Sequence, residues 1–126
     1  MDIQYLERVF PKIWCRETSA YPDRWTPENP AYGQCLSTAR IAERCLGGEI
    51  ILVFLLPEVP HFYNVLPGGR THDFTRSQFL FEFALPEGRP MQIREIDGLG
   101  HWFPEVNRRY HRLANKFMDI AGVNLV

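Results

Sequence analysis

The sequence has 126 residues and a formal net charge of −1, and 45% of its residues are hydrophobic. This length and composition predict a single folded domain spanning 1–126. The near-neutral charge predicts no basic surface for nucleic acid or an anionic membrane, and no apolar run is long enough to cross a bilayer.

The N-terminal segment MDIQYLERVF contains no apolar signal core, and the three cysteines, Cys15, Cys35 and Cys45, form no CxxC pair. An odd cysteine count without such a pair predicts a reducing cytoplasm rather than a disulfide framework. The cysteines and histidines show no familiar zinc-ligand spacing, so we expect neither a metal nor another cofactor.

Two helices are predicted in the first third of the chain. Apolar residues on one face predict a short helix over 2–10 that ends near Pro11, and 11–32 should be mostly loop. The second helix should run from about Gly33 to Leu46, where two glycines stop it. Cys35 then lies in its first turn, where the positive end of the helix dipole favours a thiolate.

The rest of this second helix should be amphipathic. Its spacing places Ala39 and Ala42 on the buried face and leaves Arg40, Glu43 and Arg44 to solvent. Cys45, near the other end of the helix, is predicted to be a core residue.

A buried strand over 49–56 is followed by a predicted hairpin, with strands at 61–66 and 70–75 joined by PGG. A three-residue loop, built on a type I turn with Gly69 left-handed, places Asp73 opposite Tyr63 and diagonal to His61. A two-residue Gly-Gly loop would put His61 and Asp73 on opposite faces. The proximity of these two side chains therefore depends on the turn.

The last third combines short strands with a final helix. Thr75 and Gln78 predict a capping box for a short helix over 76–80, and further strands are expected over 79–84 and 91–96. Pro104 should open the last helix, with His101-Trp102 in its cap region. Its expected apolar face is Val106, Tyr110, Leu113, Phe117 and Ile120. This order of elements predicts an α+β fold.

Cys35, His61 and Asp73 are the candidate catalytic residues. A cysteine nucleophile needs a nearby base, and the imidazole needs a third group to fix its tautomer and orientation. A helix start followed by two adjacent strands can bring these three side chains to one point. The structural alternative is a core cysteine and an aspartate that only shapes its local turn.

An oxyanion hole would combine the Cys35 backbone N–H with one side-chain amide, from Gln34 or from Asn29. Alternatively, Asn29 forms an Asx-type turn before Pro30 and Gln34 caps the helix. Trp25, Tyr63 and Asn64 are candidates for lining a substrate cleft, although aromatic residues at this density also build cores.

Four sequence blocks resemble the YunG family of small bacterial proteins: ETSAYPDRWTPENPAYGQCLSTA, GGEI, HFYNVLPGGR and HDFTRSQF. The resemblance covers about residues 17–79. This family in turn resembles papain-like cysteine proteins of the NlpC/P60 and transglutaminase-like kind, in which a helix-borne Cys precedes a strand His and a strand Asp. Carried over, these positions are Cys35, His61 and Asp73. Where the family has a Ser, a Trp and a turn Asp, this sequence has Pro60, Tyr63 and Gly68.

The resemblance implies a papain-like α+β core, with the Cys35 helix packed on an antiparallel sheet and a C-terminal helix. We expect a cysteine-dependent hydrolase or acyl transferase acting on the amide, thioester or isopeptide-type carbonyl of a peptide-like or small-molecule substrate. The alternative is a non-catalytic binding protein that retains this fold. The sequence specifies neither the substrate nor the oligomeric state.

Overall fold

The computed structural model describes residues 1–55, 59–80, 82–92, 95 and 105–125. Its long helices are α1 (Ile3–Ile13), α2 (Cys35–Leu46) and α4 (Val106–Ala121), and its strands are β1 (Glu49–Leu55), β2 (Val59–Val65), β3 (Thr71–His72) and β4 (Arg89–Met91). Short 3₁₀ helices span Arg16–Thr18 and Arg76–Gln78. The fold is therefore α+β, and its order of helix, loop, helix, strands and helix is the predicted one.

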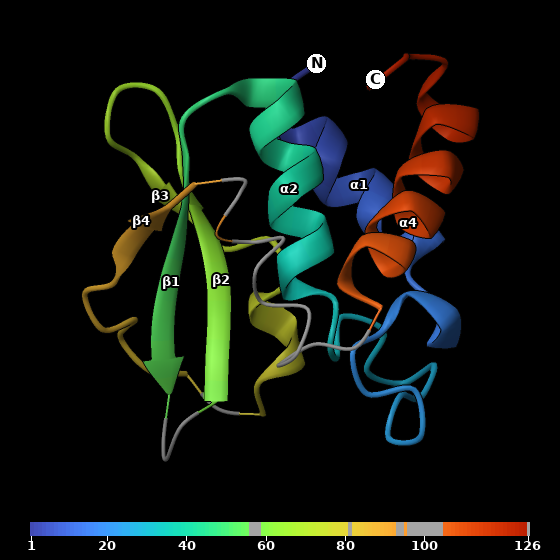
Figure 1. Ribbon diagram of the computed structural model, residues 1–126, viewed down its shortest axis with the longest axis horizontal. Helices are drawn as coiled ribbons and strands as arrows, with labels where there is room; N and C mark the ends of the chain where they lie inside the picture. The colour runs from blue at the N-terminus through green and yellow to red at the C-terminus, as the bar shows by residue number, and fades with distance from the viewer. Residues whose placement is uncertain (56–58, 81, 93–94, 96–104, 126) are drawn as a thin grey trace.

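The four strands form one antiparallel sheet in the order β3-β2-β1-β4. Helix α2 lies between this sheet and the pair formed by α1 and α4 (Figure 1). The domain thus consists of a sheet layer, a central helix and an outer helical layer. None of the helices within the described ranges is long and apolar enough to cross a membrane.

Helix α2 is buried on two sides because it is the central layer. Leu36 and Ala39 pack in one cluster with sheet residues, whereas Ile41 and Ala42 pack in another cluster with α1 and α4. Arg40, predicted to face solvent, is only 9% exposed. Its guanidinium carbon lies 3.9 Å from the centroid of the Tyr110 ring on α4. The prediction for Arg40 was wrong because α4 covers the side of α2 that the sequence pattern leaves polar.

Helix α1 continues through Pro11 and ends at Ile13, two residues beyond the expected end near Pro11. Pro11 removes one helical N–H donor, but the turn after it buries Ile13 and Trp14. The Trp14 indole N–H also donates to the Thr38 hydroxyl of α2 at 2.9 Å. These tertiary contacts outweigh the local preference for a helix end.

The hairpin of β2 and β3 has the predicted register. Asn64 pairs with His72 and Val65 pairs with Thr71, which leaves 67–69 as a three-residue loop. The turn type was wrong, however, because Gly68 has φ +94°, whereas this position of a type I turn has a negative φ. A positive φ here, after Pro67, fits a type II turn.

Further predictions of strands and caps need correction. The described part of 79–84 contains no strand, and β4 starts at Arg89, earlier than expected, because Arg89 to Met91 already pair with β1. The Gln78 amide donates to the Thr75 hydroxyl at 3.1 Å instead of closing the predicted capping box. The remainder of the expected 91–96 strand falls mostly outside the described residues.

The last helix was predicted largely correctly. Leu113 and Phe117 of α4 are fully buried, whereas Ile120 is 50% exposed, since Met118 and Ala121 are the residues of the last turn that pack against the core. The αL residue Gly122 ends the helix, and its N–H donates to the Met118 carbonyl. Pro104 and His101-Trp102 lie outside the described residues.

Candidate functional site

His61 of β2 and Asp73, the residue directly after β3, form a buried pair. His61 is 2% exposed, and its Nε2 lies 2.7 Å from Asp73 Oδ2. The three-residue loop places these side chains within reach, as the register predicts. The predicted proximity of His61 and Asp73 is thus confirmed.

The Asp73 carboxylate is held by both of its oxygens. While Oδ2 accepts from His61, Oδ1 accepts from the backbone N–H of Thr75 at 3.1 Å and from its hydroxyl at 3.2 Å. The Thr75 hydroxyl, which is also buried, accepts a hydrogen bond from the Gln78 amide. This network fixes the face that Asp73 presents to the imidazole.

Cys35 is the first residue of α2 and is half-buried. Its position at the start of the helix is set by Gly33, which has φ +75°. A Cβ at Gly33 would lie 2.2 Å from the Ser19 hydroxyl, so only glycine fits here. At the first helical position, the Cys35 backbone N–H has no acceptor within the helix and points away from it.

The pKa of His61 reflects its burial and its two neighbours. Burial, the largest influence, lowers the pKa, but the hydrogen bonds to Asp73 and Cys35 and the charges of both residues raise it to about 9. Because Nε2 is bonded to Asp73, Nδ1 is the ring nitrogen available to Cys35. Because its pKa is about 9, the imidazole beside the thiol is protonated at neutral pH.

Cys35 and His61 share a cavity of about 270 Å³. This is slightly smaller than the pockets that hold drug-sized ligands. Its other lining residues are Ala20, Tyr21, Arg24, Tyr32, Gly33, Leu55, Val59, Pro60, Gln78 and Phe79. The cavity therefore combines apolar and aromatic walls with a few polar groups around the thiol.

The two candidate oxyanion amides are engaged elsewhere. Gln34 is fully buried, where its amide donates to the Cys15 carbonyl at 2.9 Å and its oxygen accepts from Thr18 at 2.8 Å. The Asn29 amide donates to the backbone carbonyl of Gln78 at 3.1 Å. Both side chains thus connect loop segments, and neither belongs to the described lining of the cavity.

The three candidate cleft residues also lie outside the described lining of this cavity. Tyr63 is buried in a small cluster with Ile51 and Val53. Asn64 donates to the Ala39 carbonyl at 3.0 Å and so ties β2 to α2. The Trp25 indole N–H donates to the Pro30 carbonyl at 2.9 Å and stabilises the loop before α2.

Sequence reasoning misses Gln78 and Phe79 as site residues. The Phe79 ring meets the His61 ring edge-on, with centroids 5.0 Å apart, and both Gln78 and Phe79 line the cavity. A capping motif explains Thr75 and Gln78 equally well from sequence. The useful signal is the short spacing between Asp73 and these residues, since a tight turn after Asp73 keeps them beside His61.

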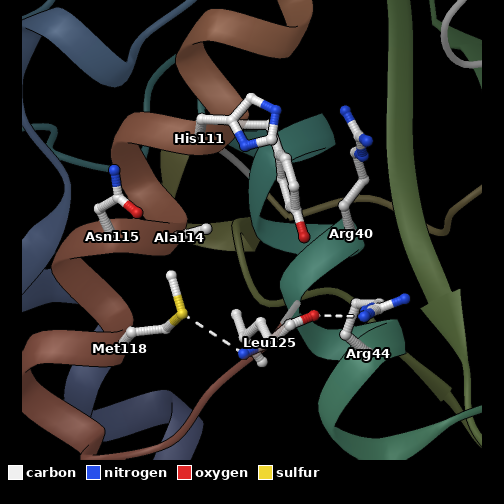
Figure 2. A pocket seen from close by; sticks show the side chains of 8 residues that line it. Arg40, Arg44, His111, Ala114, Asn115, Met118 and Leu125 are labelled. Atoms are coloured by element: carbon white, nitrogen blue, oxygen red, sulfur yellow. Dashed lines mark hydrogen bonds between the residues drawn. The ribbon is translucent and has the colours of Figure 1, made fainter.

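A second cavity, of about 250 Å³, lies between α2 and α4. Figure 2 shows Arg40 and Arg44 of α2 on one side and His111 of α4 on the other. The Arg44 guanidinium donates to the Leu125 carbonyl, which holds Leu125 at this cavity. This second cavity shares no described lining residue with the cavity of Cys35. Within the described ranges, no three His, Cys, Asp or Glu side chains gather as a metal site would require.

Comparison with known proteins identifies the family. The YunG family model, described as "YunG protein", matches residues 2–121. A curated relative, "Uncharacterized protein YunG" of Bacillus subtilis (strain 168), is 34% identical over 77 residues, which cover 61% of this chain and 63% of the relative. The aligned part thus spans less than two thirds of that relative. No solved structure gives a significant match. Because the family model covers nearly all of it, this chain belongs to the YunG family.

Proposed function

We propose that this protein is a cysteine-dependent hydrolase or acyl transferase with a papain-like arrangement, acting on an amide, thioester or isopeptide-type carbonyl. The observation that carries the proposal is the 2.7 Å bond between His61 and Asp73 beside Cys35 in a shared cavity. A nucleophile, a base and a group that orients the base are the parts that such chemistry requires. The raised pKa of His61, to about 9, supports an imidazolium beside Cys35 that can donate a proton.

The first half of the reaction acylates Cys35. The thiolate attacks the carbonyl carbon, a C–S bond forms, and the carbonyl electrons move to the oxygen. When the tetrahedral species collapses, the bond to the leaving nitrogen or sulfur breaks, and His61 gives that atom its proton. The product is a thioester on Cys35, with the leaving group released as a neutral amine or thiol.

The second half restores the enzyme. Water, or an acceptor amine in the transferase case, gives a proton to His61 and attacks the thioester carbon. The C–S bond then breaks and the Cys35 thiolate returns. Asp73 orients the imidazole in both halves.

An oxyanion hole is proposed from the Cys35 backbone N–H and the Gln78 amide. Gln78 lines the cavity, and its amide donates one of two hydrogens to Thr75. The other hydrogen is available to a substrate oxygen. Gln78 is better placed for this than Gln34 or Asn29, because neither of these two residues belongs to the described lining of the cavity.

Thiol labelling tests the proposal without a known substrate. At neutral pH, iodoacetamide should modify Cys35 at least about tenfold faster than Cys45, because burial raises the pKa of the Cys45 thiol. Peptide mass spectrometry resolves the two sites in one sample. His61→Ala should slow the labelling of Cys35 and leave that of Cys45 unchanged. Equal, slow labelling of both cysteines would contradict the proposal and favour a non-catalytic binding protein.

Acyl transfer can be tested with p-nitrophenyl acetate as a generic activated ester. Wild-type protein should release p-nitrophenol and carry an acetyl group on Cys35, detectable by mass spectrometry. Cys35→Ala should remove both signals, whereas Cys45→Ala should keep them. An added amine that accelerates turnover indicates transfer, and its lack of effect indicates hydrolysis.

A further inference from the structure

A third cavity, of about 280 Å³, lies beside that of Cys35, and its described lining residues carry an excess of positive charge. Its charged lining residues are Arg16, Glu17, Glu105, Arg108, Arg109 and Arg112. Ala20 lines both cavities, so the two meet at the segment around this residue. A small molecule at Cys35 could therefore extend past this segment toward the arginines.

Arg109 connects the two cavities electrostatically. It lies in the first turn of α4, is only 8% exposed, and lines the arginine-lined cavity. Burial lowers its pKa, and the charges of Glu105, Cys35 and Tyr21 oppose this effect. Its guanidinium charge therefore acts on the thiol and on Tyr21, which lines the cavity of Cys35.

The cations lie where the fold alone disfavours them. Arg108 and Arg109 fall in the first turn of α4, which has no acidic residue, although the helix dipole favours negative charge there. Glu105, before the helix, pairs with Arg108 at 2.6 Å. A negative group bound in the cavity would offset this arrangement.

We propose that the arginine-lined cavity receives the carboxylate of a substrate whose reacting carbonyl lies at Cys35. The inference rests on the proposed function and narrows its substrate class to acyl compounds that carry a carboxylate near the reacting carbonyl. Guanidinium groups bind carboxylate and phosphate alike. Four arginines against two glutamates leave the described lining with a net positive charge that attracts either anion, and the test below probes the carboxylate.

Two alkylating agents with the same leaving group test this inference. Iodoacetate carries a carboxylate and iodoacetamide is neutral, so the ratio of their second-order rate constants at Cys35 measures the preference for an anion. Arg109→Gln should lower this ratio about fivefold, as expected for one charge removed near a partly buried site. Arg109→Lys keeps the charge and should keep the ratio within about twofold.

Controls separate this effect from global charge and from unfolding. Arg70→Gln removes an exposed positive charge from the hairpin loop and should leave the ratio unchanged. Arg112→Gln removes an exposed lining charge, so it should lower the ratio even if Arg109→Gln fails to fold by circular dichroism. If Arg109→Gln folds, an unchanged ratio in both variants would overturn the inference. If it does not fold, an unchanged ratio in Arg112→Gln would overturn it.

The same data distinguish this inference from the proposed function. Slow iodoacetamide labelling that does not depend on His61 would refute the function itself. Fast, His61-dependent labelling with a ratio insensitive to the arginines would refute only the carboxylate site.

Discussion

His61 lies between two groups that stabilise its proton, and this makes the stability of the fold depend on pH. Its pKa rises from an ordinary 6.5 to about 9 in the folded protein. Folding therefore favours the protonated form. The resulting stabilisation is complete below about pH 6.5 and is lost as the pH rises through about 9.

We predict that the free energy of unfolding falls between these two pH values, by up to about 3 kcal/mol. Urea denaturation at several pH values measures how steeply the free energy of unfolding falls with pH. His61→Gln should flatten this dependence, because the titrating group is then gone. Cys35→Ala should narrow the pH range of the loss, because the Cys35 hydrogen bond and charge both help to raise the His61 pKa. If the free energy of unfolding still falls with pH in His61→Gln, the pH dependence comes from other titrating groups.

Thr75 is a positioning residue for the pair, since it holds Asp73 through its N–H and its hydroxyl. Thr75→Val keeps the shape of the side chain but removes the hydroxyl. The loss leaves buried polar groups short of a partner, and we expect a cost of about 1–3 kcal/mol in unfolding free energy.

The same variant should slow iodoacetamide labelling of Cys35 by roughly three- to tenfold, because Asp73 Oδ1 then keeps only the Thr75 backbone N–H and is held less firmly. Thr75→Ser keeps a hydroxyl and should restore most of the rate. The His61 pKa, followed by NMR, should fall in Thr75→Val and recover in Thr75→Ser. Loss of stability without any change in this pKa would show that Thr75 acts on the fold alone.

At the scale of elements, the turn of the β2–β3 hairpin determines whether the pair can form. The Leu66 N–H donates to the Arg70 carbonyl at 2.8 Å, and the Gly69 N–H donates to the Leu66 carbonyl at 2.9 Å. Gly68 and Gly69 both have positive φ. This sequence therefore forms a turn type that glycine favours.

We predict that Gly68→Ala destabilises the protein by about 1–2 kcal/mol, since a Cβ is strained at its φ of +94°. No described atom lies within 4 Å of such a Cβ, so the cost is conformational rather than steric. Gly68→Asn should cost less, because Asn tolerates positive φ better. Thermal unfolding compares the variants, and Cys35 labelling should be unchanged in both. An Ala variant as stable as the wild type would refute the type II assignment.

The hairpin also shows how far the sequence could predict the site. Counting residues in the PGG loop was enough to bring His61 to Asp73, because strand pairing repeats every two residues. The Gly-Gly stop and the start of α2 at Cys35 were likewise local signals. The positions of Gln78 and Phe79 were not predictable in this way. Gln78 is held by its hydrogen bond to Thr75 and Phe79 by its ring contact with His61, and neither depends on strand pairing.

Several of the other errors share one cause, which is contact between elements that are distant in sequence, whereas the errors in the turn type and in the Thr75–Gln78 cap are local. Pro11 lies inside α1 because Ile13 and Trp14 are buried by other elements. The amides of Gln34 and Asn29 bind carbonyls 19 and 49 residues away. Periodicity and spacing describe one segment at a time and cannot anticipate these partners.

At the scale of the whole molecule, α2 connects the candidate site to the core. Its first residue is Cys35. Its middle is covered by the sheet on one side and by α1 and α4 on the other (Figure 1). Arg40 lies at the contact with α4, where it stacks on Tyr110 and donates to Asn107 at 3.1 Å. The layered architecture thus places a stabilising contact on the same helix as Cys35, five positions further along.

This placement predicts that stability and reactivity can be separated along α2. Arg40→Ala removes the buried stem, the stacking on Tyr110 and the bond to Asn107, and should lower the free energy of unfolding by about 2–3 kcal/mol. Arg40→Met keeps most of the buried stem and should recover part of that loss. Arg44→Ala changes an exposed arginine one turn further on and should have a smaller effect.

In each of these variants, the iodoacetamide rate at Cys35 should stay within about twofold of the wild type under folded conditions. The reason is that Arg40 and Arg44 line the cavity of Figure 2, which shares no described residue with the cavity of Cys35. Urea denaturation and labelling of the same preparations make the comparison direct. A folded Arg40→Ala protein that labels Cys35 much more slowly would mean that the contact between α2 and α4 also positions the nucleophile. The outer helical layer would then belong to the machinery of the site.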